Sequence, residues 1–375
     1  MSFEIFTMER WQSTYEHEVL FNLSESGVEP LTIGELLQLS NVSAESLLGI
    51  ALEYNHSRGT PLLRERIAAL YPGASPANVL VTNGGAEANY LLTWDLLAAG
   101  DELVFMSPNY MQAGGLARNF GVSLREWRLR EDNGWLPDPD ALSRLVSDRT
   151  KAILVTNPNN PTGSILPEET MDAVAEAADR VGAWIIADEI YRGAELQGPE
   201  TPTFWGRSER VLVTAGLSKA YGLPGLRLGW AIVPANLVEE LWAHKDYTTI
   251  AMGTISDRLA AAALTEDVRP RLIERTRSIL NANWPIMEKW LQARSETFRW
   301  HPPQAGAIVY VGYDLPIDSL ELAERLRTEV DCLVVPGAHF EMQSYLRLGF
   351  GPEASKLSTA LERCASLIDE LRIAT

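Results

Sequence analysis

The stretch Gly216-Leu217-Ser218-Lys219-Ala220-Tyr221-Gly222-Leu223-Pro224-Gly225-Leu226-Arg227-Leu228-Gly229-Trp230 follows directly on the apolar run Val211–Val213. It places Lys219 in a tight turn of small residues between apolar strands, where an amine cannot hydrate freely. Desolvation and nearby positive charge lower the pKa of such an amine and leave it nucleophilic, as in lysines that form Schiff bases with carbonyl compounds. Because a lone loop lysine is usually a surface residue, this interpretation of Lys219 as the catalytic residue depends on the rest of the chain.

The middle of the chain alternates predicted strands and helices. Near-continuous apolar strands separated by amphipathic helices, such as Glu168–Val181, predict an α/β fold with a mostly parallel sheet covered on both sides. The predicted strands are Val79–Thr82, Leu103–Met106, Ala152–Thr156, Trp184–Ala187, Val211–Thr214 and Leu228–Val233.

The C-terminal part predicts a smaller α+β unit. Its strands are Ile308–Val311, Leu333–Val335 and Tyr345–Leu348, with helices near Leu320–Val330 and Glu353–Ile373. We expect an N-terminal segment, residues 1–48, that joins the small domain and the active site, a large domain over 49–280 and a small domain over 281–375. A long helix around Thr276–Leu291 is expected to bridge the two domains.

Several predicted strands end in residues suited to a flat, phosphorylated ligand. Gly84-Gly85-Ala86-Glu87 forms a glycine turn before a helix, where backbone N–H groups and the helix N-terminus favour an anion. Tyr110, after Leu103–Met106, can stack on a ring, and Asn160, held in the rigid turn Thr156–Gly163, can donate to a phenolate. Purely structural roles for the glycine turn and Tyr110 remain open.

The next strand delivers Asp188 and Tyr191 to the crevice at the carboxyl edge of the sheet, where open α/β sheets bind ligands. A carboxylate there can keep a pyridine nitrogen protonated, although Asp188 would equally suit a helix N-cap. Ser218 and Arg227 suit a phosphate group. Arg347, in an apolar strand, needs a buried partner, either a substrate carboxylate or a structural ion pair.

Taken in order, Asn-Pro-x-Asn-Pro-Thr-Gly, Asp-Glu-x-Tyr and Ser-Lys-x-x-Gly-x-x-Gly-x-Arg resemble the motifs of fold-type I pyridoxal 5'-phosphate (PLP) enzymes of the class I/II aminotransferase family, over nearly the whole chain. The resemblance implies a large domain with a seven-stranded-type sheet and action at the α-carbon of an L-amino acid through aldimine and quinonoid intermediates. By it, Lys219 carries the cofactor and shuttles the proton. Asp188 pairs with the pyridinium, Asn160 and Tyr191 bind the phenolate, and Tyr110 stacks on the ring. The phosphate would be held by the backbone of Gly85, Ala86 and Glu87 together with Ser218 and Arg227, and the substrate carboxylate by Arg347 and Asn160.

The resemblance also implies a homodimer with shared active sites, in which Tyr54 reaches the phosphate of the neighbouring subunit. No arginine occurs in Asp246–Met252, the region where dicarboxylate-specific members carry one. A dicarboxylic amino acid is therefore not expected as the substrate.

The segment Asn22–Leu36, which contains Gly27, is similar to the corresponding stretch of the capreomycidine- and enduracididine-forming cyclases of this family. Those enzymes eliminate a hydroxyl from a hydroxylated arginine and close its guanidine into a ring. We therefore expect Gly27 to contact the substrate, and Glu9, Glu16 or Asp246 to bind a guanidinium, although each carboxylate alone suits a solvated surface. A conventional aminotransferase and a non-catalytic PLP-binding homologue remain alternatives.

Composition restricts the possible partners. The chain has 375 residues and a net charge of −18, with no basic stripe that would neutralise the phosphates of a nucleic acid. Its two cysteines and five histidines show no metal-ligand spacing. The sequence contains no signal peptide and no apolar run of membrane-spanning length, so we expect a cytoplasmic protein that binds neither nucleic acid nor membrane.

Overall fold

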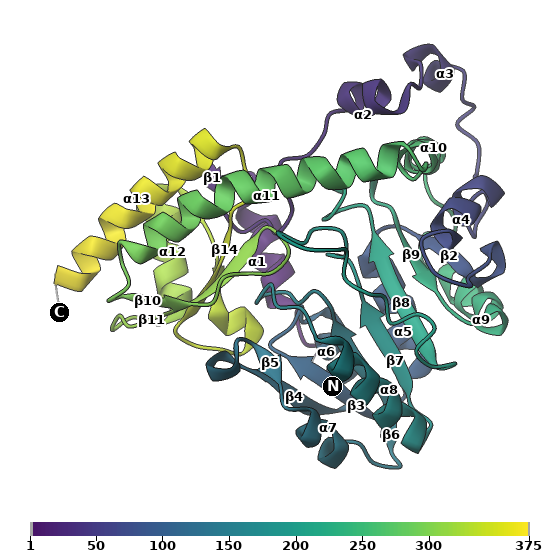
Figure 1. Cartoon of the computed structure of the whole chain (residues 1–375), viewed down its shortest axis with the longest axis horizontal. Helices are drawn as coiled ribbons and strands as arrows, with labels where there is room; N and C mark the ends of the chain where they lie inside the picture. The colour runs from purple at the N-terminus through teal and green to yellow at the C-terminus, as the bar shows by residue number, and fades with distance from the viewer. Residues whose placement is uncertain (1–2, 374–375) are drawn as a thin grey trace.

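A mixed eight-stranded sheet forms the centre of the larger part of the molecule in this computed structural model, which describes residues 3–373 (Figure 1). In sheet order, the strands are β2 (Val79–Thr82), β9 (Gly229–Ile232), β8 (Val211–Gly216), β7 (Trp184–Asp188), β6 (Thr150–Thr156), β3 (Glu102–Ser107), β4 (Ser123–Arg130) and β5 (Leu136–Pro137). From β8 to β4 neighbouring strands are parallel, whereas β9 and β5 run antiparallel to their neighbours. The prediction of a mostly parallel sheet is thus confirmed. The expected seven strands become eight because β5, with two residues, adds an edge strand too short for a hydrophobic pattern.

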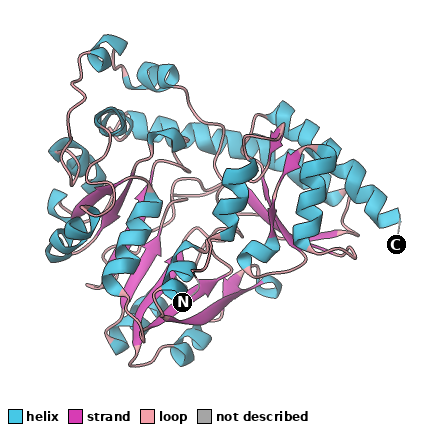
Figure 2. Ribbon diagram, turned by 180° about the vertical axis from the view of Figure 1, so that it is seen from behind, coloured by secondary structure: helices cyan, strands magenta, loops and turns pink. Residues whose placement is uncertain are grey.

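Helices cover both faces of this sheet (Figure 2). Alternate strand residues enter opposite cores, so Leu103 and Phe105 pack in one apolar cluster while Val104 and Met106 pack in the other. The first cluster includes side chains of α5 (Gly85–Leu96), α6 (Gln112–Asn119) and α9 (Ala235–Lys245), and the second includes side chains of α7 (Pro139–Leu145) and α8 (Glu168–Val181). Because both faces of the sheet are covered, its strands are accessible mainly at their ends, where loops connect them to the helices.

The smaller part contains an antiparallel sheet of β10 (Phe298–Trp300), β11 (Ile308–Tyr313), β14 (Tyr345–Gly349) and β13 (Val335–Pro336), with α12 (Ser319–Val330) and α13 (Ala354–Ile373). The strand predicted at Leu333–Val335 is divided in two. Its first half, β12 (Cys332–Leu333), pairs instead with β1 (Phe21–Asn22). This pairing attaches the N-terminal segment to the smaller part of the molecule.

Helix α11 (Val268–Gln292) runs along both parts, contacting α10 (Thr254–Ala263) and α13 (Figure 1). The predicted domain boundary at residue 280 lies inside this continuous helix. The N-terminal helices are α1 (Thr7–Tyr15), α2 (Ile33–Ser40), α3 (Ala44–Leu48) and α4 (Pro61–Ala68), and α2 and α3 project from the body. Short 3-10 turns lie at Pro76–Asn78, Glu131–Asn133, Pro224–Leu226 and Gly337–Phe340.

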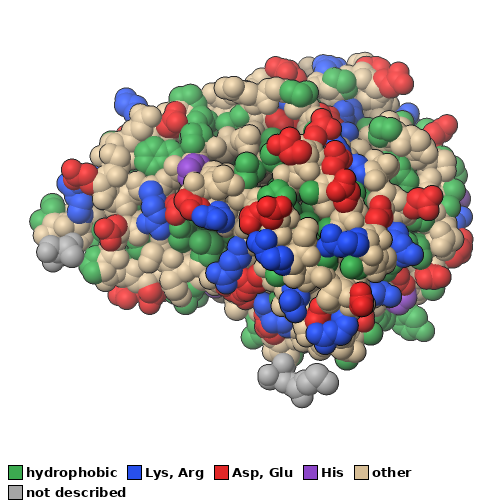
Figure 3. Space-filling view, turned by 60° about the horizontal axis from the view of Figure 1, so that its bottom comes forward, with side chains coloured by type: hydrophobic (Ala, Val, Ile, Leu, Met, Phe, Trp, Pro, Cys, Tyr) green, Lys and Arg blue, Asp and Glu red, His purple; other side chains and the backbone are tan. Residues whose placement is uncertain are grey.

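Acidic and basic side chains are interspersed on the face shown in Figure 3, where basic groups are flanked by acidic ones. Ion pairs such as Arg118–Glu4 and Arg299–Glu131 connect the larger sheet region or its helices to other segments of the chain. Within residues 3–373, the structure has no helix that combines the length and apolar character needed to cross a membrane.

Candidate active site

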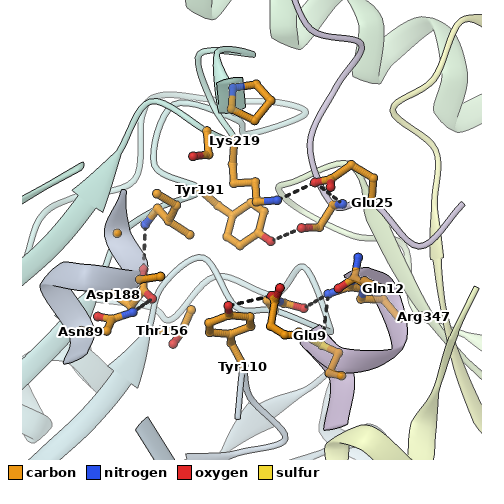
Figure 4. A pocket seen from close by; sticks show the side chains of 18 of the residues that line it. Glu9, Gln12, Glu25, Asn89, Tyr110, Thr156, Asp188, Tyr191, Lys219 and Arg347 are labelled. Carbon is orange, nitrogen blue, oxygen red and sulfur yellow. Dashed lines mark hydrogen bonds and ion pairs between the residues drawn. The ribbon is translucent and has the colours of Figure 1, made fainter. Parts of the chain in front are cut away.

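A cavity of about 340 Å³ lies at the carboxyl ends of β6, β7 and β8, and residues of helix α1 together with Glu25 and Ser26 also line it. Figure 4 shows Glu9, Gln12 and Glu25 on the side of the cavity that faces these strands. The cavity brings together most of the predicted site residues, although they come from distant parts of the chain. Those that line it are Glu9, Glu16, Gly85, Ala86, Tyr110, Asn160, Asp188, Tyr191, Ser218, Lys219, Arg227 and Arg347.

Lys219 points across the cavity to Glu25, with its Nζ 2.5 Å from Glu25 Oε1 (Figure 4). Burial lowers the pKa of Lys219, but the Glu25 carboxylate and the Tyr191 hydroxyl together raise it by more, so the net pKa lies above its ordinary value. The same pairing lowers the pKa of Glu25 from 4.5 to about 2. The predicted lowering of the Lys219 pKa is therefore wrong, because the local sequence around Lys219 carries no signal of the facing Glu25 carboxylate.

Asp188 sits at the end of β7, with its carboxylate fixed in orientation. Asn89 Nδ2 donates to Asp188 Oδ2 at 2.9 Å, and the backbone N–H of Ile190 donates to Oδ1 at 3.1 Å. Asn89 is itself held by Thr214, whose hydroxyl donates to its Oδ1 at 2.7 Å. Burial raises the pKa of Asp188 despite these donors, so a cation placed against the carboxylate would be stabilised there.

Two tyrosines lie between Asp188 and the N-terminal segment (Figure 4). Tyr110 donates from its hydroxyl to Glu9 Oε1 at 2.8 Å, and burial raises its pKa well above the ordinary value, with Glu9 adding to the effect. Tyr191 donates to Ser26 Oγ at 2.8 Å, and burial raises its pKa as well. Both rings are thereby tied to residues that precede the large sheet in sequence.

The opposite end of the cavity suits a phosphate. Helix α5 begins at Gly85 with Gly84 at its N-cap, which has no side chain to bond the free N–H groups of the first turn. The Arg227 guanidinium lies against Gly84, since a Cβ on that glycine would come within 2.7 Å of Arg227 Nη2. Ser218 also lines the cavity.

Arg347 lies on β14 and is 1% exposed. Its Nη1 donates to Asn160 Oδ1 at 2.9 Å and its Nη2 donates to the Ser24 carbonyl, whereas its Nε has no hydrogen-bond partner among the described residues. Burial lowers its pKa, so an anionic partner would offset the cost of burying the charge. A carboxylate that reaches this guanidinium from the cavity would meet that need.

Four of the predicted site residues are not among the described residues that line the main cavity. Glu87, whose predicted phosphate contact is through its backbone, lies in the first turn of α5, and its side chain accepts from Thr249 Oγ1 at 2.7 Å. Gly27 lies next to Lys219 and lines a neighbouring cavity. Tyr54 is 88% exposed. The prediction for Asp246 is corrected, because this residue ends α9 on its exposed side, while the apolar side of the helix packs on the sheet.

The sequence interpretation missed Gln12, Glu25 and Asn89, all of which line the cavity. Asn89 lies one helical turn after Gly85, so its position on the same helix face could have been inferred. For Glu25 and Gln12 the sequence holds no comparable signal, because the N-terminal segment reaches the site only through tertiary packing.

The sequence profile described as Aminotransferase class I and II matches residues 33–364, which is most of the chain. The chain belongs to this aminotransferase family. Its cofactor is PLP, and the protein is a PLP-dependent enzyme of the class I/II family. The resemblance inferred from the motifs is thereby confirmed, as is the fold class.

The relatives of this chain include both a cyclase and aminotransferases. The chain is 33% identical to capreomycidine synthase of Streptomyces vinaceus over 97% of this chain and 93% of the relative. A PLP-dependent aminotransferase from Streptococcus suis superposes with a TM-score of 0.93 at 30% identity, over 99% of each chain. The PLP-dependent cyclase OrfR superposes with a TM-score of 0.90 at 26% identity, over 100% of this chain and 99% of the cyclase.

The donor set of the cavity fits PLP. The free N–H groups of α5 and Arg227 face the end suited to the phosphate, and the oriented Asp188 carboxylate can pair with the ring nitrogen. Lys219 supplies the amine, and the Tyr110 ring lines the part of the cavity that the cofactor ring would occupy. These assignments of individual residues are our proposal for how the family cofactor is held.

Proposed function

We propose that this enzyme converts a hydroxylated arginine into a cyclic amino acid, as a cyclase and dehydratase. One observation carries the proposal: three carboxylates, Glu9, Glu16 and Glu25, line the same cavity as Arg347. Burial raises the pKa of Glu16, and the neighbouring Glu25 and Glu9 charges raise it further against the opposing effect of His17. Such a cluster favours a cationic side chain. The likeness to capreomycidine synthase and to the cyclase OrfR agrees with this chemistry.

In this proposal Arg347 binds the α-carboxylate, and the Lys219 amine removes the proton from the α-carbon. When bound, PLP supplies an electron sink for that proton removal. The carboxylates of α1 and the following segment hold the guanidine close to the carbon that loses its hydroxyl. The hydroxyl leaves as water and a guanidine nitrogen adds to the chain, so the product is lighter than the substrate by one water.

A conventional aminotransferase with a non-dicarboxylate amino donor is the second candidate. The likeness to the Streptococcus suis aminotransferase favours it, because the proposed cofactor contacts are common to both reactions. Among the described residues that line the cavity, the basic side chains are Lys219, Arg227 and Arg347. All three have other proposed roles, so this subunit offers no further cation for a second substrate carboxylate. A non-catalytic homologue would not need the lysine, and absence of a borohydride-trapped adduct at Lys219 would support that alternative.

The deciding experiment is mass spectrometry of the PLP-loaded protein with 3-hydroxy- and 4-hydroxy-L-arginine, assayed separately without a 2-oxo acid. Repeated turnover to a product lighter by one water supports the cyclase. A single stoichiometric burst of 2-oxo acid and pyridoxamine phosphate supports the aminotransferase instead.

The carboxylate cluster can be tested directly. Glu9→Gln and Glu16→Gln should each raise the KM for arginine-like substrates by about 10-fold, because each removes a charge-assisted hydrogen bond to the guanidinium. Steady-state kinetics with arginine-like and uncharged substrates measure the effect, and Glu18→Gln serves as the exposed control. Unchanged KM values in both variants would remove these two residues from the proposal.

We also propose a homodimer with shared active sites. The projecting arm consists of α2, α3 and the following residues to Tyr54, and its Leu48 and Leu52 side chains are each 86% exposed. Thr254 donates to the Glu53 carbonyl at 2.9 Å, which places this arm beside the start of α10 and its exposed Ile255. Large apolar side chains that are exposed to water in this way are typical of a protein–protein interface, and a second copy of the chain would bury them. Tyr54 lies in the same arm, so it would reach the cavity of the partner.

A further inference from the structure

Glu25 has no part in the cofactor contacts proposed above, yet it forms the ion pair with Lys219. Besides the 2.5 Å contact with Lys219 Nζ, Glu25 Oε1 accepts from the backbone N–H groups of Ser26 at 3.0 Å and Gly27 at 3.2 Å. Its side chain is 42% exposed, so it remains open to a ligand on one side. The carboxylate is thus oriented by the backbone and accessible at the same time.

The segment that carries Glu25 is fixed on both sides. Its neighbours bind the site directly, since the Ser24 carbonyl accepts from Arg347 and Ser26 Oγ accepts from Tyr191. At the back, a Cβ on Gly349 would lie 2.3 Å from the Glu25 carbonyl oxygen, so the segment is packed against the end of β14. Glu25 therefore stands at a fixed place beside the proposed site for the substrate carboxylate.

Glu25 also lines a second cavity of about 330 Å³, which it shares with Glu16. This neighbouring cavity contains Glu29, which pairs with Lys356 at 3.8 Å. Glu25 and Glu16 thus form the boundary between the two spaces, and a cation that approaches from either side meets both carboxylates.

The pairing with Lys219 cannot persist unchanged once the cofactor is attached. Condensation of the lysine amine with the cofactor aldehyde releases water, and the nitrogen then keeps at most one N–H of the three that the ammonium has. Glu25 loses most of its ion pair, while its two backbone donors remain. A carboxylate so placed favours a replacement cation.

We infer that Glu25 changes partner: it holds Lys219 in the cofactor-free protein and binds the cationic side chain of the substrate in the loaded enzyme. The second half of this inference rests on the proposed function, and it makes Glu25 a determinant of specificity for that substrate. The first half concerns the cofactor-free protein alone.

The first half is tested by mixing cofactor-free protein with PLP and following covalent attachment by absorbance from pH 6 to pH 9. Glu25→Gln keeps an oxygen for the backbone donors but removes the charge, so Lys219 should lose its proton more easily and attachment at pH 7 should be about 10-fold faster. Glu25→Asp should restore part of the delay, and Glu29→Gln should behave as the wild type. Equal rates and pH profiles for wild type and Glu25→Gln would overturn this half.

The second half is tested by calorimetric binding to the loaded enzyme of 5-guanidinopentanoate and of its uncharged match, 5-ureidopentanoate. Neither ligand has an α-amino group, so neither can react. Wild type and Glu29→Gln should prefer the guanidino ligand, and Glu25→Gln should reduce that preference by about 10- to 100-fold. A preference that survives in Glu25→Gln overturns the role of Glu25 but leaves the proposed function intact. No preference in the wild type overturns both.

Discussion

At the scale of single residues, Arg347 combines deep burial with an incomplete set of hydrogen bonds. Arg347→Lys should raise the KM for the amino acid substrate by about 10- to 100-fold, because lysine cannot present the planar two-point donor set that a carboxylate accepts. Steady-state kinetics measure this change. Arg130→Lys, an exposed arginine paired with Asp132, is the matched control. An unchanged KM in Arg347→Lys would mean that Arg347 has only the structural contacts with Asn160 and Ser24.

The Glu25–Lys219 pair predicts how the stability of the cofactor-free protein depends on pH. The folded-state pKa of Glu25 is lowered from 4.5 to about 2, so its stabilisation is present above pH 4.5 and is lost as the pH falls toward 2. The pKa of Lys219 is raised, so its contribution is present below 10.5 and is lost as the pH rises beyond that value.

Chemical unfolding of cofactor-free wild type and Glu25→Gln should therefore show the largest difference in free energy of unfolding between pH 6 and 8. The difference should shrink below pH 4.5, and Glu29→Gln should follow the wild type. A difference that stays constant down to pH 3 would contradict the ion pair.

The same residues show how far the sequence predicts this site. Lys219, Asp188 and Asn160 follow buried strands, and the ends of such strands meet at one edge of a sheet, so their convergence could be inferred from strand order. Glu25 and Gln12 reach the cavity only because β1 pairs with β12 and α1 packs against the smaller part. That docking depends on contacts between segments about 310 residues apart, for which the local sequence carries no signal.

At the scale of elements, α1 forms one wall of the cavity through Met8, Glu9 and Gln12. Trp11 fastens this helix to the smaller part, since its Nε1 donates to the Val334 carbonyl at 2.9 Å and its ring centroid lies 6.1 Å from that of His339. Trp11→Ala should weaken the docking of α1 by about 1–3 kcal/mol, because it removes both the hydrogen bond and the packing of a partly buried ring.

Trp11→Ala should consequently raise KM more than it lowers kcat and expose the N-terminal segment to limited proteolysis. The control Trp300→Ala, a partly buried tryptophan at the end of β10, should leave the N-terminal cleavage pattern unchanged. Equal cleavage in wild type and Trp11→Ala would show that α1 docks without this tryptophan.

The elements that the sequence predicts are those with a strong hydrophobic pattern. Helix α8 has the predicted bounds, and β2, β6 and β7 lie within two residues of theirs, because each buries a regular apolar face or run. Strand β4 escaped prediction because it reads Ser-Leu-Arg-Glu-Trp-Arg-Leu-Arg and lies next to the edge strand, where alternate side chains are exposed. Helix α3 buries no residue at all, so its sequence had no apolar face to detect.

At the scale of the whole molecule, the exposed arm is the feature that supports the proposed homodimer. An arm with Leu48, Leu52 and Tyr54 turned to solvent buries little apolar surface within one subunit. A symmetric dimer would cover it and would bring Tyr54 of the partner subunit toward the phosphate end of each cavity. In that proposal the active site is shared between two subunits, whereas the geometry of one subunit accounts for the other proposed cofactor contacts.

Shared sites can be tested by mixing two inactive variants. Lys219→Ala lacks the reactive amine, and Tyr54→Ala should bind PLP about 10-fold or more weakly, so it is largely empty at limiting cofactor. In a hybrid dimer, one cavity has both the Lys219 of one subunit and the Tyr54 of the other. After unfolding and refolding as an equal mixture, about a quarter of all cavities should be intact and activity should return in proportion.

Lys219→Ala mixed with Arg227→Ala is the control, because both changes affect the same subunit's contribution and no cavity in the hybrid is complete. If activity returns in the mixture with Tyr54→Ala but not in the mixture with Arg227→Ala, the active site is shared between subunits. If activity returns in neither mixture, Tyr54 does not contribute to the partner's active site.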